Sequence, residues 1–296
     1  MRTIVLNRGN LIGDGQNNKM IYQFPGSVLF QDTYIAVSQI SMYYSWYNIS
    51  QALQNNTLQY TWRVGATTST FTITIPDGLY EVAVLNELLQ YSFIENGHYL
   101  VNASGQNVYY AEILVNPSRY AVQLNTFLVP LALPAGWNEP ASWTGYSTAT
   151  FNPQFILPTR VNELLGFSVG FTTDANTSNA YVPPSGQDYI SKLANGTLSY
   201  ISTTAPDIQP NSSILVSVSN IDNQYSQPSS ILYSIVPNVA IGELISEKPP
   251  QYAWNKLING TYNQLRLTFL GTDLNPIKIN DPSITILLVL KDKGDI

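Results

Sequence analysis

The chain has 296 residues, of which 44% are hydrophobic and only 11% are charged. The hydrophobic share is enough for a packed core and excludes a wholly disordered chain. The charged share is well below the roughly 25% usual in globular domains, so the surface is expected to consist of neutral amides and hydroxyls. Such a surface resists precipitation poorly. This favours a protein that works inside an assembly, although a coding bias toward asparagine explains the composition equally well.

The formal net charge is −6, and the 13 lysines and arginines are scattered along the chain. Nucleic-acid binding needs clustered positive charge, so we expect no direct contact with nucleic acid. The absence of cysteine excludes disulfides and thiolate metal sites. The first residues lack the pattern of a signal peptide, and no apolar stretch approaches the ~18 residues of a membrane span. We therefore expect intracellular synthesis and no membrane span.

The first half of the chain predicts strands interrupted by one helix. Residues 1–18 are expected to form an extended N-terminal arm, and a short strand from Met20 is expected to end at Pro25. A long strand at 34–47 carries aromatic residues on both faces, and a hairpin is expected at 58–75. A helix is then predicted near 80–95, where apolar residues recur at three- and four-residue spacing, and it should cover the sheets.

The second half predicts further strands and two long loops. A hairpin is expected at 108–129, and one helical turn from Thr159 to Gly166. The long loops are expected at 130–158 and 172–212. Short strands follow, and the chain closes on two apolar strands, Leu265–Phe269 and Ile284–Leu290. Many short strands between turn clusters, with one helix, indicate an all-β fold, an antiparallel sandwich rather than alternating α/β layers.

Catalytic chemistry has few candidates in this sequence. The single histidine, His98, has no Gly-x-Ser-x-Gly nucleophile motif to partner it, and a histidine in a turn is usually structural. One histidine without cysteine excludes ordinary zinc sites. Asp14, Asp207 and Asp222 lack the dense spacing of a calcium loop, so turn capping is favoured. We therefore predict no catalytic residue, no cofactor and no metal site.

Two tryptophans in the loop at 130–158 are the strongest binding candidates. Trp137 and Trp143 lie among prolines, where burial is harder than in a strand. Three interpretations remain open, in decreasing order of weight: packing against the core, a subunit interface, and stacking on a sugar ring.

The order of several short motifs resembles the minor capsid (penton) proteins of virophages and the related Polinton/Maverick viruses. The motifs are spread over most of the chain: Ile21–Phe24, Ile35–Tyr47, Ile75–Tyr80, Gly97–Leu100, Val115–Tyr120, Leu164–Phe167 and Leu265–Lys291. The resemblance implies a single jelly roll of two four-stranded antiparallel sheets, here residues 19–296. The sequence departs from the family in showing no separate insertion domain, and the loops at 130–158 and 172–212 are the candidates for a small one. The resemblance also implies a homopentamer at the five-fold vertices of an icosahedral virion, where it would contact the major capsid protein.

The leading hypothesis is thus a non-enzymatic structural virion protein. The candidate interface residues are Arg2, Ile4 and Leu6 of the arm, together with Trp137 and Trp143. One alternative is a carbohydrate-binding jelly-roll module that uses the two tryptophans. Another is a glycoside hydrolase of sandwich fold, which would need two carboxylates lining one cleft.

Overall fold

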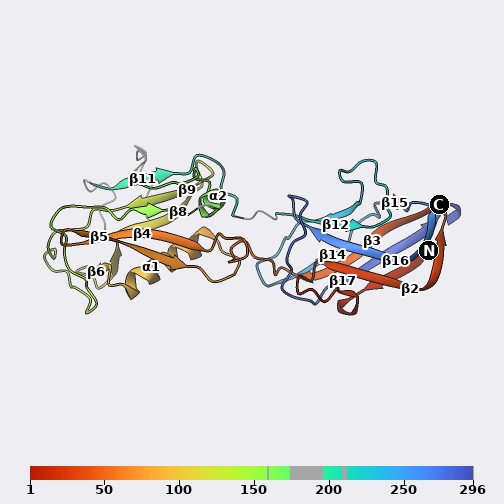
Figure 1. Cartoon of the computed structure of the whole chain (residues 1–296), viewed down its shortest axis with the longest axis horizontal. Coiled ribbons are helices and arrows are strands. Elements are labelled where there is room, and N and C mark those ends of the chain that lie inside the picture. The colour runs from red at the N-terminus through yellow and green to blue at the C-terminus, as the bar shows by residue number, and fades with distance from the viewer. Residues whose placement is uncertain (159, 174–195, 209–211, 296) are drawn as a thin grey trace. The chain divides into compact units, whose positions relative to one another are not determined.

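The computed structural model describes residues 1–158, 160–173, 196–208 and 212–295. The chain divides into two compact units. The first, here called the jelly-roll unit, combines residues 1–47 with residues 209–296, and the second, here called the inserted unit, is residues 48–208. Both consist mainly of antiparallel strands (Figure 1). The expected single domain over residues 19–296 is therefore wrong.

The jelly-roll unit contains two facing antiparallel sheets. Its strands are β1 (Arg2–Leu6), β2 (Lys19–Phe30), β3 (Thr33–Tyr43), β12 (Ile214–Val218), β13 (Ile231–Ile235), β14 (Leu244–Glu247), β15 (Asn255–Lys256), β16 (Gly260–Leu270) and β17 (Thr285–Asp292). One sheet has the order β1-β17-β3-β14, with the short β15 also paired to β3, and the other has the order β13-β12-β16-β2. Without the short β15, this unit has eight strands. The sheet β1-β17-β3-β14 holds the first, eighth, third and sixth of them in chain order, and the other sheet holds the remaining four. This is the jelly-roll order, so the predicted fold class is confirmed for this unit.

The two closing strands were correctly predicted but do not pair with each other. β16 lies between β12 and β2, whereas β17 lies between β1 and β3 in the other sheet. Leu267 and Phe269 of β16 are fully buried, as are Ile286 and Leu288 of β17. Alternate residues of both strands therefore fill the core between the sheets.

The outer side of β17 is not covered by the predicted helix, because that helix belongs to the inserted unit. The segment before β15 lies there instead. The Lys291 ammonium is 4.3 Å from the centre of the Trp254 ring, and the Tyr252 hydroxyl is 3.4 Å from that of Ser38 on β3. Aromatic side chains of this segment therefore lie beside the outer side of the sheet at β17 and β3.

The predicted N-terminal arm over residues 1–18 is also wrong. Its first residues form β1, which pairs with β17 from Arg2 opposite Leu290 to Leu6 opposite Ile286. Ile4 and Leu6 alternate with polar or exposed positions and point into the core, where burial stabilises them. The strand at Met20 also runs past Pro25 to Phe30. Pro25 is tolerated because β2 lies at a sheet edge, where it opposes an irregular register of β16.

The inserted unit has its own sheets and its own core. Its strands are β4 (Thr57–Val64), β5 (Thr67–Thr74), β6 (Tyr99–Val101), β7 (Asn107–Tyr109), β8 (Ala111–Asn116), β9 (Ala121–Thr126), β10 (Phe155–Ile156) and β11 (Leu198–Ile201). They form the sheets β10-β4-β5, β11-β9-β8 and β6-β7. The expected hairpins at 58–75 and 108–129 are thus β4–β5 and β8–β9.

The predicted helix is α1 (Val82–Glu95), which packs mainly on β8. Leu85, Leu89 and Phe93 of this helix join the buried core of the inserted unit, where Tyr60 and Trp62 of β4 also lie. The predicted helical turn is α2 (Val161–Leu165), followed by Gly166 in the left-handed conformation. Its predicted cap, Thr159, and most of the loop at 172–212 lie outside the described residues.

Asn48 joins the two ends of the inserted unit. Its side-chain amide donates to the carbonyl of Ile208 at 2.7 Å and to the carbonyl of Tyr80 at 2.8 Å. Its side-chain oxygen accepts from the Tyr80 backbone N–H at 2.8 Å. A buried side chain with all these partners holds the first and last residues of this unit together. This fits a unit that is inserted between two consecutive strands of the jelly-roll unit, β3 and β12.

The burial of β1 predicts that Leu6→Ala destabilises the jelly-roll unit by about 2–5 kcal/mol, because it leaves a cavity at a side chain with 0% exposure. The matched control is Val5→Thr on the same strand, whose side chain is 48% exposed and whose replacement should stay within about 0.5 kcal/mol. Calorimetric unfolding of both variants measures the difference. Equal stability of the two variants would show that residues 1–18 are an arm after all.

The Asn48 contacts predict that Asn48→Asp destabilises the inserted unit by more than about 3 kcal/mol at neutral pH, because a buried carboxylate would face two carbonyl oxygens. Asn138→Asp makes the same charge change at an exposed position and serves as the control. Hydrogen exchange of amides in β4 and β9 reports the stability of this unit. Unchanged protection in the Asn48 variant would contradict the assigned role.

Candidate functional site

The candidate interface residues of β1 do not share one environment. Arg2 is exposed, pairs with Asp292 at 2.7 Å and places its guanidinium 5.9 Å from the ring centre of Phe30. Ile4 and Leu6 are buried in the sandwich core, so the expectation that they reach a neighbouring subunit is wrong for this conformation. Only Arg2 remains accessible, and its interface role stays a prediction.

Trp137 and Trp143 are half-buried and pack against the core of the inserted unit. The Trp143 ring centre lies 6.1 Å from that of Trp62 in an edge-to-face contact and 5.2 Å from that of Tyr146. Core packing was the interpretation given most weight, and these contacts agree with it. Roles for the two tryptophans at a subunit interface or on a sugar stay predictions.

His98 lies within the core of the inserted unit. Its ring stacks on Trp62 with 4.4 Å between centres, and its Nδ1 lies 2.9 Å from the Tyr60 hydroxyl. Burial lowers the pKa of His98 to about 3 and raises that of Tyr60 to about 12. Both groups are therefore neutral at physiological pH, and the histidine acts as a packed aromatic ring.

A buried row of polar side chains crosses the sheet β11-β9-β8. Gln123 donates to Asn125 at 2.7 Å and to Ser199 at 2.8 Å, and Asn125 donates to Glu112 at 2.8 Å. Asn116 extends the row by donating to Gln123 at 3.0 Å. The side chains satisfy one another, which explains how β9 can be buried on both faces with polar residues on one of them. This row is a structural element of the sheet.

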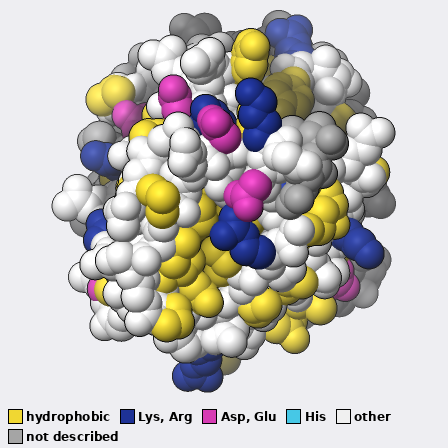
Figure 2. Space-filling model, turned by 90° about the vertical axis from the view of Figure 1, so that its right-hand side faces the viewer, with side chains coloured by type: hydrophobic (Ala, Val, Ile, Leu, Met, Phe, Trp, Pro, Cys, Tyr) yellow, Lys and Arg dark blue, Asp and Glu magenta, His cyan; other side chains and the backbone are white. Residues whose placement is uncertain are grey.

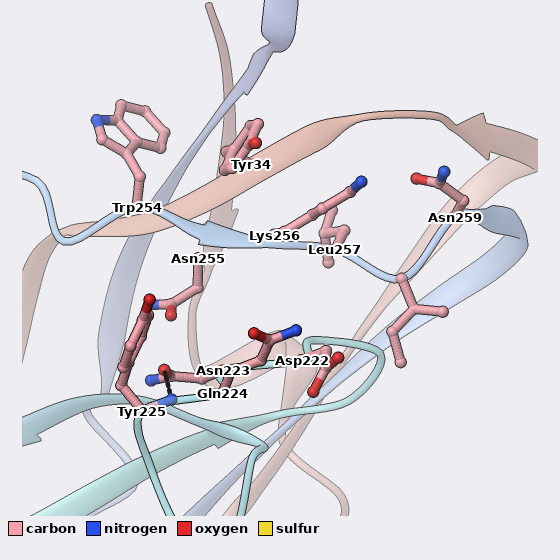
Figure 3. Close-up of a pocket in the computed structure, with 11 residues that line it drawn as sticks. Tyr34, Asp222, Asn223, Gln224, Tyr225, Trp254, Asn255, Lys256, Leu257 and Asn259 are labelled. Atoms are coloured by element: carbon pink, nitrogen blue, oxygen red, sulfur yellow. Dashed lines mark hydrogen bonds between the residues drawn. The ribbon is translucent and has the colours of Figure 1, made fainter.

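A cavity with converging polar groups lies in the jelly-roll unit (Figure 3). It has a volume of about 640 Å³ and lies between the β12–β13 loop and the segment around β15. Its lining comprises Tyr34, Asp222, Asn223, Gln224, Tyr225, Trp254, Asn255, Lys256, Leu257, Ile258 and Asn259. We call it the β15 pocket.

Main-chain hydrogen bonds build the walls of the β15 pocket. The Ile258 N–H donates to the Asn220 carbonyl at 2.8 Å, and the Asp222 N–H donates to the Lys256 carbonyl at 3.3 Å. These bonds tie the β12–β13 loop to the segment after β15. The pocket is thus held by backbone contacts on both sides.

The charges around the β15 pocket nearly cancel. Lys256 donates to Asp32 at 2.6 Å, and this contact lowers the pKa of the Asp32 carboxyl and raises that of the lysine. Asp32 lies outside the lining, and Asp222 is the carboxylate that belongs to it. Within the described ranges, no group of three or more His, Asp or Glu side chains is arranged to hold a metal ion. Neither described helix is long and apolar enough to cross a membrane.

Sequence reasoning missed the β15 pocket. From its spacing, Asp222 is predicted to be a turn cap, with a calcium ligand as the alternative, and no sequence motif marks Tyr225 or Trp254. The two walls are separated in sequence by β13, β14 and their loops. The bridge between Ile221 and Leu257 and the backbone hydrogen bonds beside it bring them together.

Comparison with known proteins gives no match to any protein-family model and no match among curated sequences. Among solved structures, the mavirus penton protein is similar, with 11% identity, coverage of 98% of this chain and 96% of that chain, and a TM-score of 0.41. A chain in the cryo-electron microscopy structure of the Sputnik virophage has 12% identity, coverage of 99% of both chains and a TM-score of 0.38. Both similarities extend over nearly the full length of each chain.

The low pKa of His98 predicts a stability loss in mild acid. Above the ordinary pKa of 6.5 the ring is neutral in the folded and unfolded states, so it contributes no pH dependence. Between 6.5 and about 3, only the unfolded state takes up the proton. The unfolding free energy of the inserted unit should therefore fall with decreasing pH by up to about 1.4 kcal/mol per pH unit.

Two measurements check this prediction. In His98→Gln, the difference in calorimetric stability between pH 6.5 and pH 5 should shrink, whatever the absolute stability of the variant. Because the chain has one histidine, its imidazole NMR signals should keep their neutral shifts at pH 5 in the native protein. A protonated ring at pH 5 in the folded protein would contradict the assignment.

Proposed function

We propose that the protein is a structural component of a virion, and specifically a penton subunit that forms homopentamers at the five-fold vertices of an icosahedral capsid. The observation that carries the proposal is the strand order of the jelly-roll unit. Two four-stranded sheets in this order are the fold that the sequence resemblance implies, and jelly rolls are frequent in viral capsid proteins. In this role the protein contacts the major capsid protein and has no catalytic activity.

The surface of the jelly-roll unit is suited to contacts with neighbouring subunits. Figure 2 shows neutral polar side chains and backbone over most of one face, with hydrophobic side chains gathered between them and charges scattered. A surface with few charges loses little solvation free energy when a neighbour covers it. It also offers few like-charge contacts that would repel another copy of the chain.

The two edges of the sandwich offer different apolar side chains, as a closed ring requires. At one edge, β1 and β2 contact each other, and Leu29 of β2 is 65% exposed. β13 and β14 lie at the other ends of their sheets, and Leu244 of β14 is 46% exposed. A five-fold ring uses heterologous contacts, in which one patch meets a different patch on the neighbour. We propose that the β1–β2 edge of one subunit packs on the β13–β14 edge of the next.

Native mass spectrometry of the full chain tests this proposal, with and without the major capsid protein. We expect pentamers, and we expect Leu29→Asp and Leu244→Asp each to reduce them to monomers, because each places a charge in an apolar contact. Val115→Asp, at an exposed position of β8 in the inserted unit, is the matched control and should still form pentamers. Monomers alone at all protein and salt concentrations, in both preparations, would refute the proposal.

A further inference from the structure

One exposed aromatic ring in the jelly-roll unit stands beside a group of amides. Tyr225, in the β12–β13 loop, is 99% exposed, an unusual position for a large ring that makes no core contact. In Figure 3, the Tyr225 side chain and that of Asn255 lie toward each other, while Trp254 points to the other side of β15. The ring of Tyr225 therefore forms one wall of the β15 pocket.

The loop that carries Tyr225 is held in place by its own hydrogen bonds. The Asn223 side-chain oxygen accepts from the Tyr225 N–H at 3.1 Å, and its amide donates to the Ile231 carbonyl at 3.0 Å. The Asn223 N–H donates to the Ser229 carbonyl at 2.9 Å, and the Ser226 hydroxyl donates to the Pro228 carbonyl at 2.9 Å. These bonds fix the loop backbone that carries the ring, so a ligand bound there would not have to order the loop.

Several polar groups of the pocket have bonding capacity left for a ligand. In the part of the chain that the structure describes, the Asp222 carboxylate and the Gln224 amide make no hydrogen bond. Asn255 uses one amide proton, for the Ala253 carbonyl at 3.2 Å. An amide provides two donors and an acceptor oxygen, and a carboxylate provides only acceptors. Together these side chains suit a ligand whose neighbouring groups both donate and accept hydrogen bonds.

Charge and polarity narrow the class of ligand. The one cationic side chain in the described lining, Lys256, is already paired with Asp32, and Asp222 would repel an anion. An apolar ligand would leave the amides without partners, which costs free energy. A neutral sugar fits both requirements, because its hydroxyls donate and accept while its C–H face packs on an aromatic ring.

We infer that the β15 pocket binds a neutral oligosaccharide, with one sugar ring packed on Tyr225 and its hydroxyls bonded to Asp222, Gln224 and Asn255. This site is separate from Trp137 and Trp143, the tryptophans of the inserted unit that the sequence suggested for sugar stacking. It goes beyond the proposed capsid role and does not depend on it. A pentamer that binds no glycan would contradict this inference alone, and a monomer that binds a glycan would contradict the capsid role alone.

The test is a glycan array probed with the full chain. The array should display neutral oligosaccharides built on glucose, galactose, mannose, N-acetylglucosamine and fucose, beside sialylated and sulfated ones. We expect binding to a subset of the neutral glycans. For the best of them, calorimetric titration should give a dissociation constant that rises by about tenfold or more in Tyr225→Ala and stays within about threefold in Tyr225→Phe, which keeps the ring.

Matched variants separate the pocket from general effects of losing a tyrosine. Tyr120→Ala removes another exposed tyrosine, in the turn between β8 and β9, and should leave the affinity unchanged. Asp222→Asn removes the charge but keeps the shape, and should weaken binding by less than Tyr225→Ala does. The inference is overturned if no neutral glycan binds, if sialylated or sulfated glycans bind more tightly, or if Tyr225→Ala binds as the native chain does.

Discussion

The pairing of β17 with β1 on one side and β3 on the other is the interaction on which the jelly-roll unit depends. It joins the first strand, the last strand and the strand that precedes the inserted unit into one sheet. Ile286 and Leu288 of β17 are fully buried between the sheets, so this pairing also supplies the centre of the core. Without β17, β1 would lose its strand partner and β3 would keep only β14 and β15, so the sheet would lose its centre and one side of the core.

The closeness of the two ends of the inserted unit explains how the chain can leave the jelly roll after β3 and return at β12. A long excursion adds little entropic cost once its ends are close, because the cost of loop closure grows only slowly with length. Within the inserted unit, Asn48 bonds the carbonyl of Ile208, so the excursion begins and ends at neighbouring points. The inserted unit buries its own core around Tyr60, Trp62 and Phe93, and it needs no strand from the jelly roll to complete its sheets.

Much of the local structure was predictable, whereas the division of the chain was not. The period of two in 58–75 and 108–129 and the helical spacing around Leu85 and Leu89 are local signals, and the structure has strands and a helix there. Strands of both units carry the same signal, so nothing local tells which sheet a strand joins. The alternation of Ile4 and Leu6 was a strand signal, yet only the long-range partner, β17, distinguishes a sheet strand from an arm. The candidate pocket escaped prediction for the same reason, since its walls meet only through tertiary pairing.

The jelly-roll unit has two kinds of surface, its sheet edges and its β12–β13 loop, which differ in whether their backbone groups are hydrogen-bonded. Its sheet edges end in exposed strands with apolar side chains such as Leu29 and Leu244, and an edge strand has unpaired backbone groups that favour association with another chain. The β12–β13 loop differs, because its backbone groups are bonded to each other and to the segment after β15. That leaves side chains, Tyr225 and Asp222 among them, as the groups available to a partner. Edges suited to extended contacts and a loop suited to a small ligand can therefore act on one subunit without competing for the same residues.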